Sequence, residues 1–508
     1  MEEKNYTLSD IQQKSVDRLK TTVAHVVALS PGCGKTLLIL SFIQDILDGT
    51  DHKCIFMIPK SARAAFLKEM DTRIKQPYIL ICAGKPYSYS EMEKHRFIFI
   101  ENTLVSKYVE DLVSLANTHT CHLVIDEAHS LQNSDSVFSR AAWEVRCYCK
   151  RIYAMTATPL MNSIEGLFNL YHFVFPRVFV SWFRFRARYC ITQEHTIRMK
   201  NRNGALIQRK VTEIVGYQNM QELNETLDKL TIKGCVHYNV NFEFLECELD
   251  AQSEKPYRLA ASGLFDILYH PEKAKARAKS KKKCGDDSLN SIEEKDFGSR
   301  LHDLQRCVDG CDIVEADQNF ISNKMRMLIA AVKSIMLRNE STLIYFEYKD
   351  SLEMAERILN SMKDEIGFNK IYRLTGDEKE ETRASIEKNL GLKEIVLCSQ
   401  AASQSRNLQR SNNLIIANLP FSVGRLVQVT GRICRQDSTY DHQNIIILTI
   451  KETIDEYKAT LFKDHLSLIS KLLGDEGTGV LTDCEYIDID RSNMKELKNS
   501  LLWRRNKR

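Results

Sequence analysis

The chain has 508 residues, of which 43% are hydrophobic and 27% are charged, and its formal net charge is +4. This length suits two or more domains with buried cores, and the composition excludes a disordered or fibrous protein. No apolar run is long enough to span a bilayer, so we expect no membrane contact. The fifteen cysteines lack zinc-site spacing, and no signal-peptide pattern is seen. We therefore expect free thiols in an intracellular, reducing compartment, either cytoplasm or nucleus.

A strand, a turn and a helix follow one another near the N-terminus. Val26–Leu29 is an apolar run of the buried-strand type, and the turn after it carries Gly32 and Gly34. Glycines let the backbone curl with its N–H groups pointing inward, and the N-terminus of the next helix favours an anion. The stretch predicts a phosphate-binding loop in which Lys35 reaches the phosphates and Thr36 binds Mg²⁺. Leu29 stands where this pattern usually has its first glycine.

Two adjacent carboxylates follow another hydrophobic strand. This strand begins at Cys121 and ends in Asp126 and Glu127. ATP hydrolysis needs one carboxylate for Mg²⁺ and a second one to orient the attacking water. We expect Asp126 to hold the metal and Glu127 to orient the water. A further strand, from Arg151, ends in Thr156–Thr158.

Strands and helices alternate throughout this region, which predicts a mostly parallel sheet. Ligands of such sheets bind at the carboxyl ends of the strands. The phosphate loop, the two carboxylates and Thr156 all fall at such ends. Their agreement favours a nucleotide site.

Aromatic and basic residues alternate in the stretch from Trp182 to Tyr189. This pattern suits phosphate contact and base stacking. It equally suits an amphipathic helix that packs its aromatic rings on the core while its arginines extend to water. The basic run Glu272–Lys283 is more typical of a solvated loop.

A second set of short apolar strands and helices begins near Phe320. Between its last two strands lies a Q-x-x-G-R-x-x-R pattern, formed by Gln428, Gly431, Arg432 and Arg435. At helical spacing Gln428 and the two arginines share one face. Two guanidinium groups on one face suit arginine fingers, which stabilise the charge of a transferring phosphate.

Taken together, these motifs resemble superfamily 2 helicases and translocases, and most closely the Swi/Snf-type branch. The matching segments are Gln12 as the adenine-reading glutamine, "SPGCGKT", "IPKSARAAFLKE", "DEAH", "TATPLMN" with "LFNLYHFVFP", "YRLTGDEKEETR" and "QVTGRICRQ". Motif V departs from the family, because "CSQAASQSRNLQ" has lost its glycines. The short middle segment makes the chain resemble compact phage or viral DNA helicases, including branch-migration enzymes.

The resemblance implies an α/β fold with two tandem RecA-like parallel-sheet lobes and a mainly helical insertion between them. The expected divisions are lobe one at 1–178, the insertion at 179–319, lobe two at 320–475 and a C-terminal tail at 476–508. ATP and Mg²⁺ are the implied cofactors. Besides Lys35, Thr36, Asp126, Glu127, Arg432 and Arg435, the implied nucleotide contacts are Gln12, Gly32, Cys33, Gly34 and Gln428. His129, Thr156 and Thr158 are the implied coupling residues, and the candidates for nucleic-acid contact are Lys60, Ser61, Trp182, Arg184, Arg186, Arg188 and Asn407.

We therefore expect a DNA-dependent ATPase that moves along DNA and unwinds or remodels forked and branched duplexes, as a monomer, in replication, recombination or repair, together with proteins of those processes. An alternative is a duplex-DNA translocase that displaces bound proteins without separating the strands. An RNA helicase or a nucleotide-gated scaffold fits the motifs less well. Cys33, between the two loop glycines, is expected to lie near the phosphates.

Overall fold

The computed structural model describes residues 6–21, 24–29, 33–85, 87–156, 164–200, 206–234, 239–269, 301–311, 313, 317, 319–376, 378, 380–399, 408, 410–420, 423–433, 440 and 442–460. The chain divides into two compact units. The first comprises Met1–His237 and takes in Ser422–Gly431, and the second comprises Tyr238–Phe421 and Arg432–Asp464. None of the described helices is both long enough and apolar enough to cross a membrane.

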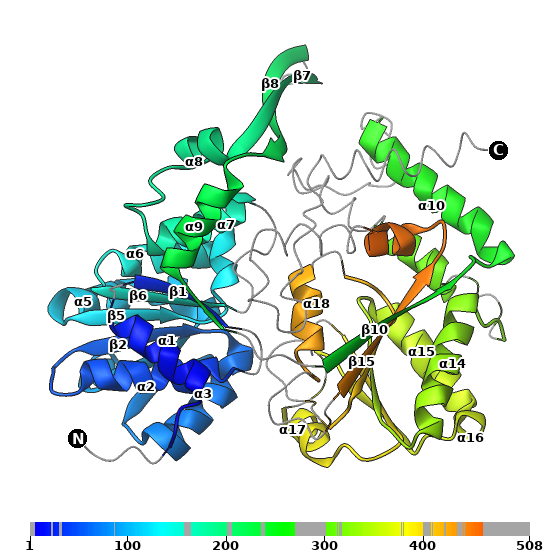
Figure 1. Cartoon of the computed structure of the whole chain (residues 1–508), viewed down its shortest axis with the longest axis horizontal. Coiled ribbons are helices and arrows are strands. Elements are labelled where there is room, and N and C mark those ends of the chain that lie inside the picture. Colours follow the sequence, from blue (N-terminus) through cyan, green and yellow to red (C-terminus); the bar gives the residue numbers. More distant parts are fainter. Residues whose placement is uncertain are drawn as a thin grey trace. The chain divides into compact units, whose positions relative to one another are not determined.

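The first unit is built on a seven-stranded sheet in which all neighbouring strands are parallel. The strand order is β3-β4-β2-β5-β6-β1-β9 (Figure 1). The bounds are β1 (Ala24–Leu29), β2 (Lys53–Ile58), β3 (Tyr78–Ile81), β4 (Phe97–Glu101), β5 (Cys121–Ile125), β6 (Arg151–Thr156) and β9 (Thr231–Gly234).

Both faces of this sheet are covered because its strands are apolar on both sides. Successive side chains of a strand point to opposite faces, and Val26 and Val27 accordingly belong to two different hydrophobic cores. The core that contains Val27 is covered by α1 (Asp10–Lys20), α2 (Lys35–Leu47) and α3 (Arg63–Glu69). The core that contains Val26 is covered by α4 (Tyr89–Lys94), α5 (Val109–Thr118), α6 (Val137–Arg146), α7 (Ile164–Val174), α8 (Trp182–Tyr189) and α9 (Met220–Leu230).

The segment between the two expected lobes contains more strand than the sequence suggested. β7 (Cys190–Lys200) and β8 (Leu206–Tyr217) pair as a two-stranded antiparallel hairpin, which extends from the α8–α9 region in Figure 1. β9 then adds to the edge of the first sheet beside β1. The first unit therefore continues to residue 237, through the first part of the segment expected to be a separate insertion, because this edge of its sheet is completed only at residue 234.

The second unit is built on a six-stranded sheet, which is also parallel throughout. The strand order is β10-β15-β14-β11-β13-β12. The strands are β10 (Asn239–Cys247), β11 (Thr342–Tyr345), β12 (Lys370–Leu374), β13 (Glu394–Cys398), β14 (Asn413–Ile416) and β15 (His442–Ile450). The helices of this unit, in chain order, are α10 (Ala251–Tyr269), α14 (Asn323–Leu337), α15 (Lys349–Ser361), α16 (Lys363–Ile366) and α17 (Glu380–Asn389). The next helix in the chain, α18 (Val423–Thr430), lies in the segment Ser422–Gly431 that groups with the first unit. Two parallel α/β lobes confirm the predicted fold class.

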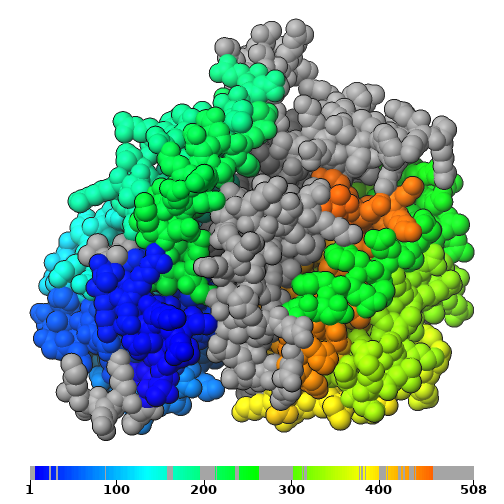
Figure 2. All heavy atoms as spheres, in the orientation of Figure 1, coloured from blue at the N-terminus to red at the C-terminus, as the bar shows by residue number. Residues whose placement is uncertain are grey.

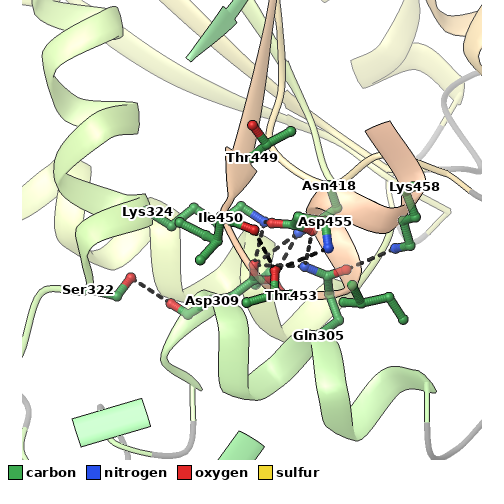
Figure 3. A network of polar contacts seen from close by, with 12 residues as sticks. Gln305, Asp309, Ser322, Lys324, Asn418, Thr449, Ile450, Thr453, Asp455 and Lys458 are labelled. Atoms are coloured by element: carbon green, nitrogen blue, oxygen red, sulfur yellow. Dashed lines mark hydrogen bonds and ion pairs between the residues drawn. The ribbon is translucent and has the colours of Figure 1, made fainter. Parts of the chain in front are cut away.

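A buried ion network fixes the carboxyl-end side of the second sheet (Figure 3). The Lys324 ammonium donates to Asp309 at 2.8 Å and to Asp455 at 2.7 Å, and all three side chains are essentially inaccessible to solvent. The Gln305 amide donates to both carboxylates, at 3.2 and 3.0 Å. Asn418, just beyond β14, donates to both oxygens of Asp309. The network therefore ties a helical segment before α14, α14 itself and the ends of β14 and β15 together.

Replacing Lys324 with methionine should destabilise the second unit strongly. It would leave two buried carboxylates without their cation, and breaking a buried pair in this way costs about 3–5 kcal/mol. Lys333→Met is the matched control, because Lys333 lies on the same helix and makes an exposed pair with Glu365, worth at most about 1 kcal/mol. Urea unfolding of the full chain measures both variants, and equal effects would contradict this account of the network.

Lys458 gives the protein a specific dependence on pH. Burial lowers the pKa of its ammonium from 10.5 to about 8, although Asp455 and Glu347 act in the opposite direction. Between these two pKa values the unfolded chain binds more protons than the folded chain, so the cost of burying this charge fades as the pH rises. The stability of the wild type relative to Lys458→Met should therefore increase between about pH 8 and pH 10. Urea midpoints that run parallel over this range would contradict the shift.

Candidate active site

Three neighbouring strands bring the predicted motifs to one edge of the first sheet. β1 pairs with β6 so that Ala28 lies opposite Thr156, and β5 pairs with β6 so that Ile125 lies opposite Ala154. The segments that leave these strands at their carboxyl ends therefore start side by side. They are the phosphate loop after β1, the Asp126–Glu127 turn after β5 and the segment after Thr156.

The phosphate loop is held against α1 by one side chain. The Gln12 amide accepts the backbone N–H of Ser9 at 2.9 Å, and it donates to the carbonyls of Cys33 and Gly34 at 3.2 and 3.1 Å. Ser9 in turn accepts the Gln12 backbone N–H, which completes a capping box at the start of α1. Gln12 thus caps one helix and holds the loop that begins the next.

Gly34 needs to be glycine for two separate reasons. Its φ of +68° lies in the left-handed region, which L side chains rarely adopt. A Cβ atom at this position would also lie 2.3 Å from the Gln12 amide nitrogen. The residue N-caps α2, so its conformation sets where the helix starts and where Lys35 and Thr36 stand.

Charged groups from the loop and from the end of β5 act on one another. The Lys35 ammonium donates to the Leu29 carbonyl at 2.7 Å. Burial, and then the neighbouring Glu127 carboxylate, raise the pKa of Asp126 from 3.8 to about 7, while the positive charge of Lys35 opposes this rise. Asp126 is 9% exposed. A buried carboxylate of this kind gains stability from a nearby cation.

Glu127 is held in an unusual backbone conformation next to a histidine. Its φ is +48°, in the left-handed region, although it is not glycine. Strained residues of this kind cluster at functional sites, where the surroundings impose the conformation. The Glu127 carboxylate lies 3.2 Å from the His129 imidazole. The turn therefore orients two of the predicted side chains toward each other.

Two further contacts near the site involve residues that belong to no recognised motif and were not predicted from the sequence. The Asn169 amide on α7 donates to the Gln132 carbonyl at 2.7 Å, which links α7 to η4 (Ala128–Gln132), the turn that contains His129. The buried Glu101 carboxylate at the end of β4 pairs with Arg63 at 3.1 Å. Both contacts depend on which segments lie together in three dimensions, and the sequence alone holds no signal for that.

The Cys33 thiol, which we expect near the phosphates, is buried in the first unit. This side chain is 1% exposed and belongs to the hydrophobic core on the α2 side of the sheet. Its Sγ lies 3.8 Å from the Gly234 carbonyl of β9. The apolar character of an uncharged thiol explains this burial. Cys33 therefore contributes its backbone carbonyl to the loop, and its thiol is part of the core.

The candidate nucleic-acid contacts in the first unit lie on two elements. Lys60 and Ser61 belong to η1 (Lys60–Ala62), directly after the carboxyl end of β2. The other four lie on α8 and differ in their surroundings. Trp182 packs against the core, whereas Arg188 makes two contacts of 2.7 Å with Glu222. Arg184 is exposed to solvent, whereas Arg186 is half-buried.

Of the candidates in the second half, the structure describes Arg432 and the backbone of Gln428, which lies in α18. Arg432 is 8% exposed. Its carbonyl accepts the Leu408 N–H at 3.1 Å, and its positive charge acts on the Cys398 thiol at the end of β13. Gly32, Thr158, Asn407, Arg435 and the side chain of Gln428 lie outside the described residues, as does the basic run Glu272–Lys283.

The parallel sheet, the loop at its carboxyl edge and the buried acidic turn define a P-loop type of nucleotide-binding protein. Residues 17–302 match the SNF2-related domain, and residues 323–437 match the helicase conserved C-terminal domain. The first match alone covers more than half of the chain. The chain therefore belongs to the SNF2-related family, which confirms the resemblance to the Swi/Snf branch. Its likeness to phage or viral helicases stays a prediction.

Several known proteins are similar to the chain at low identity. Human chromodomain-helicase-DNA-binding protein 1 is 23% identical over 326 residues, covering 61% of this chain and 17% of that protein. The fission-yeast SWI/SNF chromatin-remodeling complex subunit snf22 is 20% identical, with 92% of this chain and 28% of that protein covered. The chain thus spans only a small part of these two relatives. The uncharacterized ATP-dependent helicase YqhH of Bacillus subtilis is 21% identical, with 92% and 79% covered.

A solved structure, the Sulfolobus solfataricus SWI2/SNF2 ATPase core in complex with dsDNA, is also similar to the chain. It covers 93% of this chain and 94% of its own, at 17% identity and a TM-score of 0.40.

Gly34→Ala should weaken nucleotide binding and lower stability by more than the usual cost of a left-handed alanine, about 1–2 kcal/mol. The added methyl group would collide with Gln12. Gly49→Ala is the matched control, because Gly49 also has a φ of +68° but has no neighbour within 4 Å of a Cβ atom. Thermal unfolding and binding of a fluorescent ATP analogue measure both effects. Equal losses in the two variants would show that the Gln12 contact is unimportant, whereas partial recovery in Gly34→Ala with Gln12→Ala would support it.

Proposed function

We propose that the chain is an ATP-dependent motor that moves along DNA. The observation that carries this proposal is the meeting of Lys35, Asp126 and Glu127 at one edge of the first sheet, in a chain that belongs to the SNF2-related family. The names of the similar proteins describe helicases and chromatin-remodeling subunits. These names support DNA as the substrate.

Different residues of the first unit would bind the phosphates, bind Mg²⁺ and position the attacking water. Backbone N–H groups at the start of α2 and the Lys35 ammonium would hold the phosphates. The Thr36 hydroxyl and the Asp126 carboxylate are the oxygen ligands that Mg²⁺ prefers, and the raised pKa of Asp126 fits a site that takes a cation. Bound Mg²⁺ would neutralise charge on the phosphate oxygens. Glu127, oriented by its strained backbone and by His129, would position the attacking water.

The motif around Gln428, Arg432 and Arg435 is the next part of this proposal. Guanidinium groups stabilise the charge that develops on a transferring phosphate, and such a contribution is worth about three to five decades in rate. We propose that Arg432 and Arg435 supply this stabilisation during ATP hydrolysis. Hydrolysis would then be linked to motion of the chain on DNA.

The finer activity that we propose is unwinding or remodeling of forked and branched DNA by a compact enzyme of this family. The second candidate is a duplex translocase that displaces proteins, and the chromatin-remodeling names of the relatives favour it. Strand-displacement and protein-displacement assays on the same forked DNA separate these two candidates. Stronger stimulation of ATP hydrolysis by RNA than by DNA would contradict both of them.

Lys35→Ala and Glu127→Gln should each reduce DNA-stimulated ATP hydrolysis by at least about 100-fold, since each removes a group that the reaction requires. Glu127→Gln should still bind ATP, whereas Lys35→Ala should bind it weakly. Glu91→Gln and Lys94→Ala are matched controls, because this pair is exposed on α4. Substantial turnover by either site variant, measured by phosphate release, would contradict the assignment.

A further inference from the structure

The inner face of helix α8 packs against the core of the first unit, with Phe185 and Tyr189 buried and Trp182 half-buried. Trp182, Phe185 and Tyr189 follow one another at the spacing of one helix face. The ring of Phe168 on α7 lies 5.6 Å from that of Trp182 and 5.3 Å from that of Phe185. The Tyr189 hydroxyl donates to Glu222 at 2.8 Å. These three aromatic rings hold the helix in place, so they are committed to the core.

The outer face of α8 carries one large aromatic ring that is exposed to solvent. Phe183 is 73% exposed, and the Arg186 guanidinium lies 5.7 Å from the centre of its ring. Val178 and Val180, just before the helix, are also more than half exposed. We call Val178, Val180 and Phe183, with Arg184 and Arg186, the α8 patch. Figure 2 shows the teal and green atoms of this part of the chain at the surface of the first unit.

The chain segment that carries the α8 patch is rich in arginine and has no acidic residue. The sequence has no acidic residue between Glu165 and Glu194, but it has four arginines in that interval, at 177, 184, 186 and 188. Glu222 of α9 pairs with Arg188, which leaves the positive charge concentrated around Phe183. An exposed aromatic ring among arginines suits a ligand that has flat rings and negative charges at regular spacing.

We propose that Phe183 stacks on an unpaired base of single-stranded DNA while Arg184 and Arg186 contact the neighbouring phosphates. This inference rests on the proposed function, since it names the surface by which the motor holds a separated strand. Phe183, rather than the predicted Trp182, is the stacking residue in this proposal, because the Trp182 ring is packed against the core. The link between Gln132 and Asn169 on α7, and the packing of α7 on α8, join this surface to the acidic turn of the active site.

Phe183→Ala tests the stacking contact directly. Binding of labelled oligo-dT should weaken by about 5- to 100-fold, the usual range for one stacked base. Binding of an abasic strand of equal length should change less than twofold, because that strand keeps the phosphates and lacks the bases. Val137→Ala is the matched control, since Val137 is a 61% exposed apolar residue on α6 of the same unit.

Phe183→Trp provides a second, spectroscopic readout. This variant should bind oligo-dT with nearly wild-type affinity, and its additional tryptophan emission should be quenched by oligo-dT but not by the abasic strand. Unchanged oligo-dT affinity in Phe183→Ala, or unquenched emission in Phe183→Trp, would overturn the inference, and a surface used by a protein partner would give that result. Measuring DNA-stimulated ATP hydrolysis by the wild type distinguishes failure of the proposed function from failure of the stacking contact. Absence of this stimulation contradicts the proposed function, whereas its presence with an unaffected Phe183→Ala contradicts only the stacking contact.

Discussion

The contact between the Gln12 amide and the backbone of Cys33 and Gly34 is the interaction on which the candidate site depends. It fixes the start of α2, and the start of α2 fixes Lys35 and Thr36. Because the same amide also caps α1, the first helix of the chain and the phosphate loop are stabilised together. A side chain larger than hydrogen at position 34 would displace Gln12, so this arrangement admits only glycine there.

The parallel sheet converts these local features into a common site. Parallel strands place all their carboxyl ends at one edge, so loops far apart in the sequence begin beside one another. The loop after β1 and the acidic turn after β5 meet in this way, with β6 between their strands. The electrostatic consequence is a buried Asp126 with a raised pKa, opposed by Lys35. In the second unit, the Lys324 network joins the segments that follow the carboxyl ends of β14 and β15.

Much of this could be predicted from sequence, because it follows from short-range patterns. The apolar strands, the glycine turn and the acidic pair after β5 each leave a local signal. The long hairpin of β7 and β8 left no such signal, and neither did the addition of β9 and β10 to the two sheets, because strand pairing over long separations depends on tertiary packing. The two interpretations of the Trp182–Tyr189 stretch both had merit. Periodicity identified its inner face, but only the structure separates the packed Trp182 from the exposed Phe183.

The central claim is that the chain couples ATP hydrolysis to DNA. Steady-state phosphate release by the full chain, measured with and without forked DNA at saturating ATP and Mg²⁺, tests it most directly. The account predicts slow hydrolysis by the protein alone and a strong increase when DNA is added. Hydrolysis at the same rate with and without DNA, or none in either case, would contradict it.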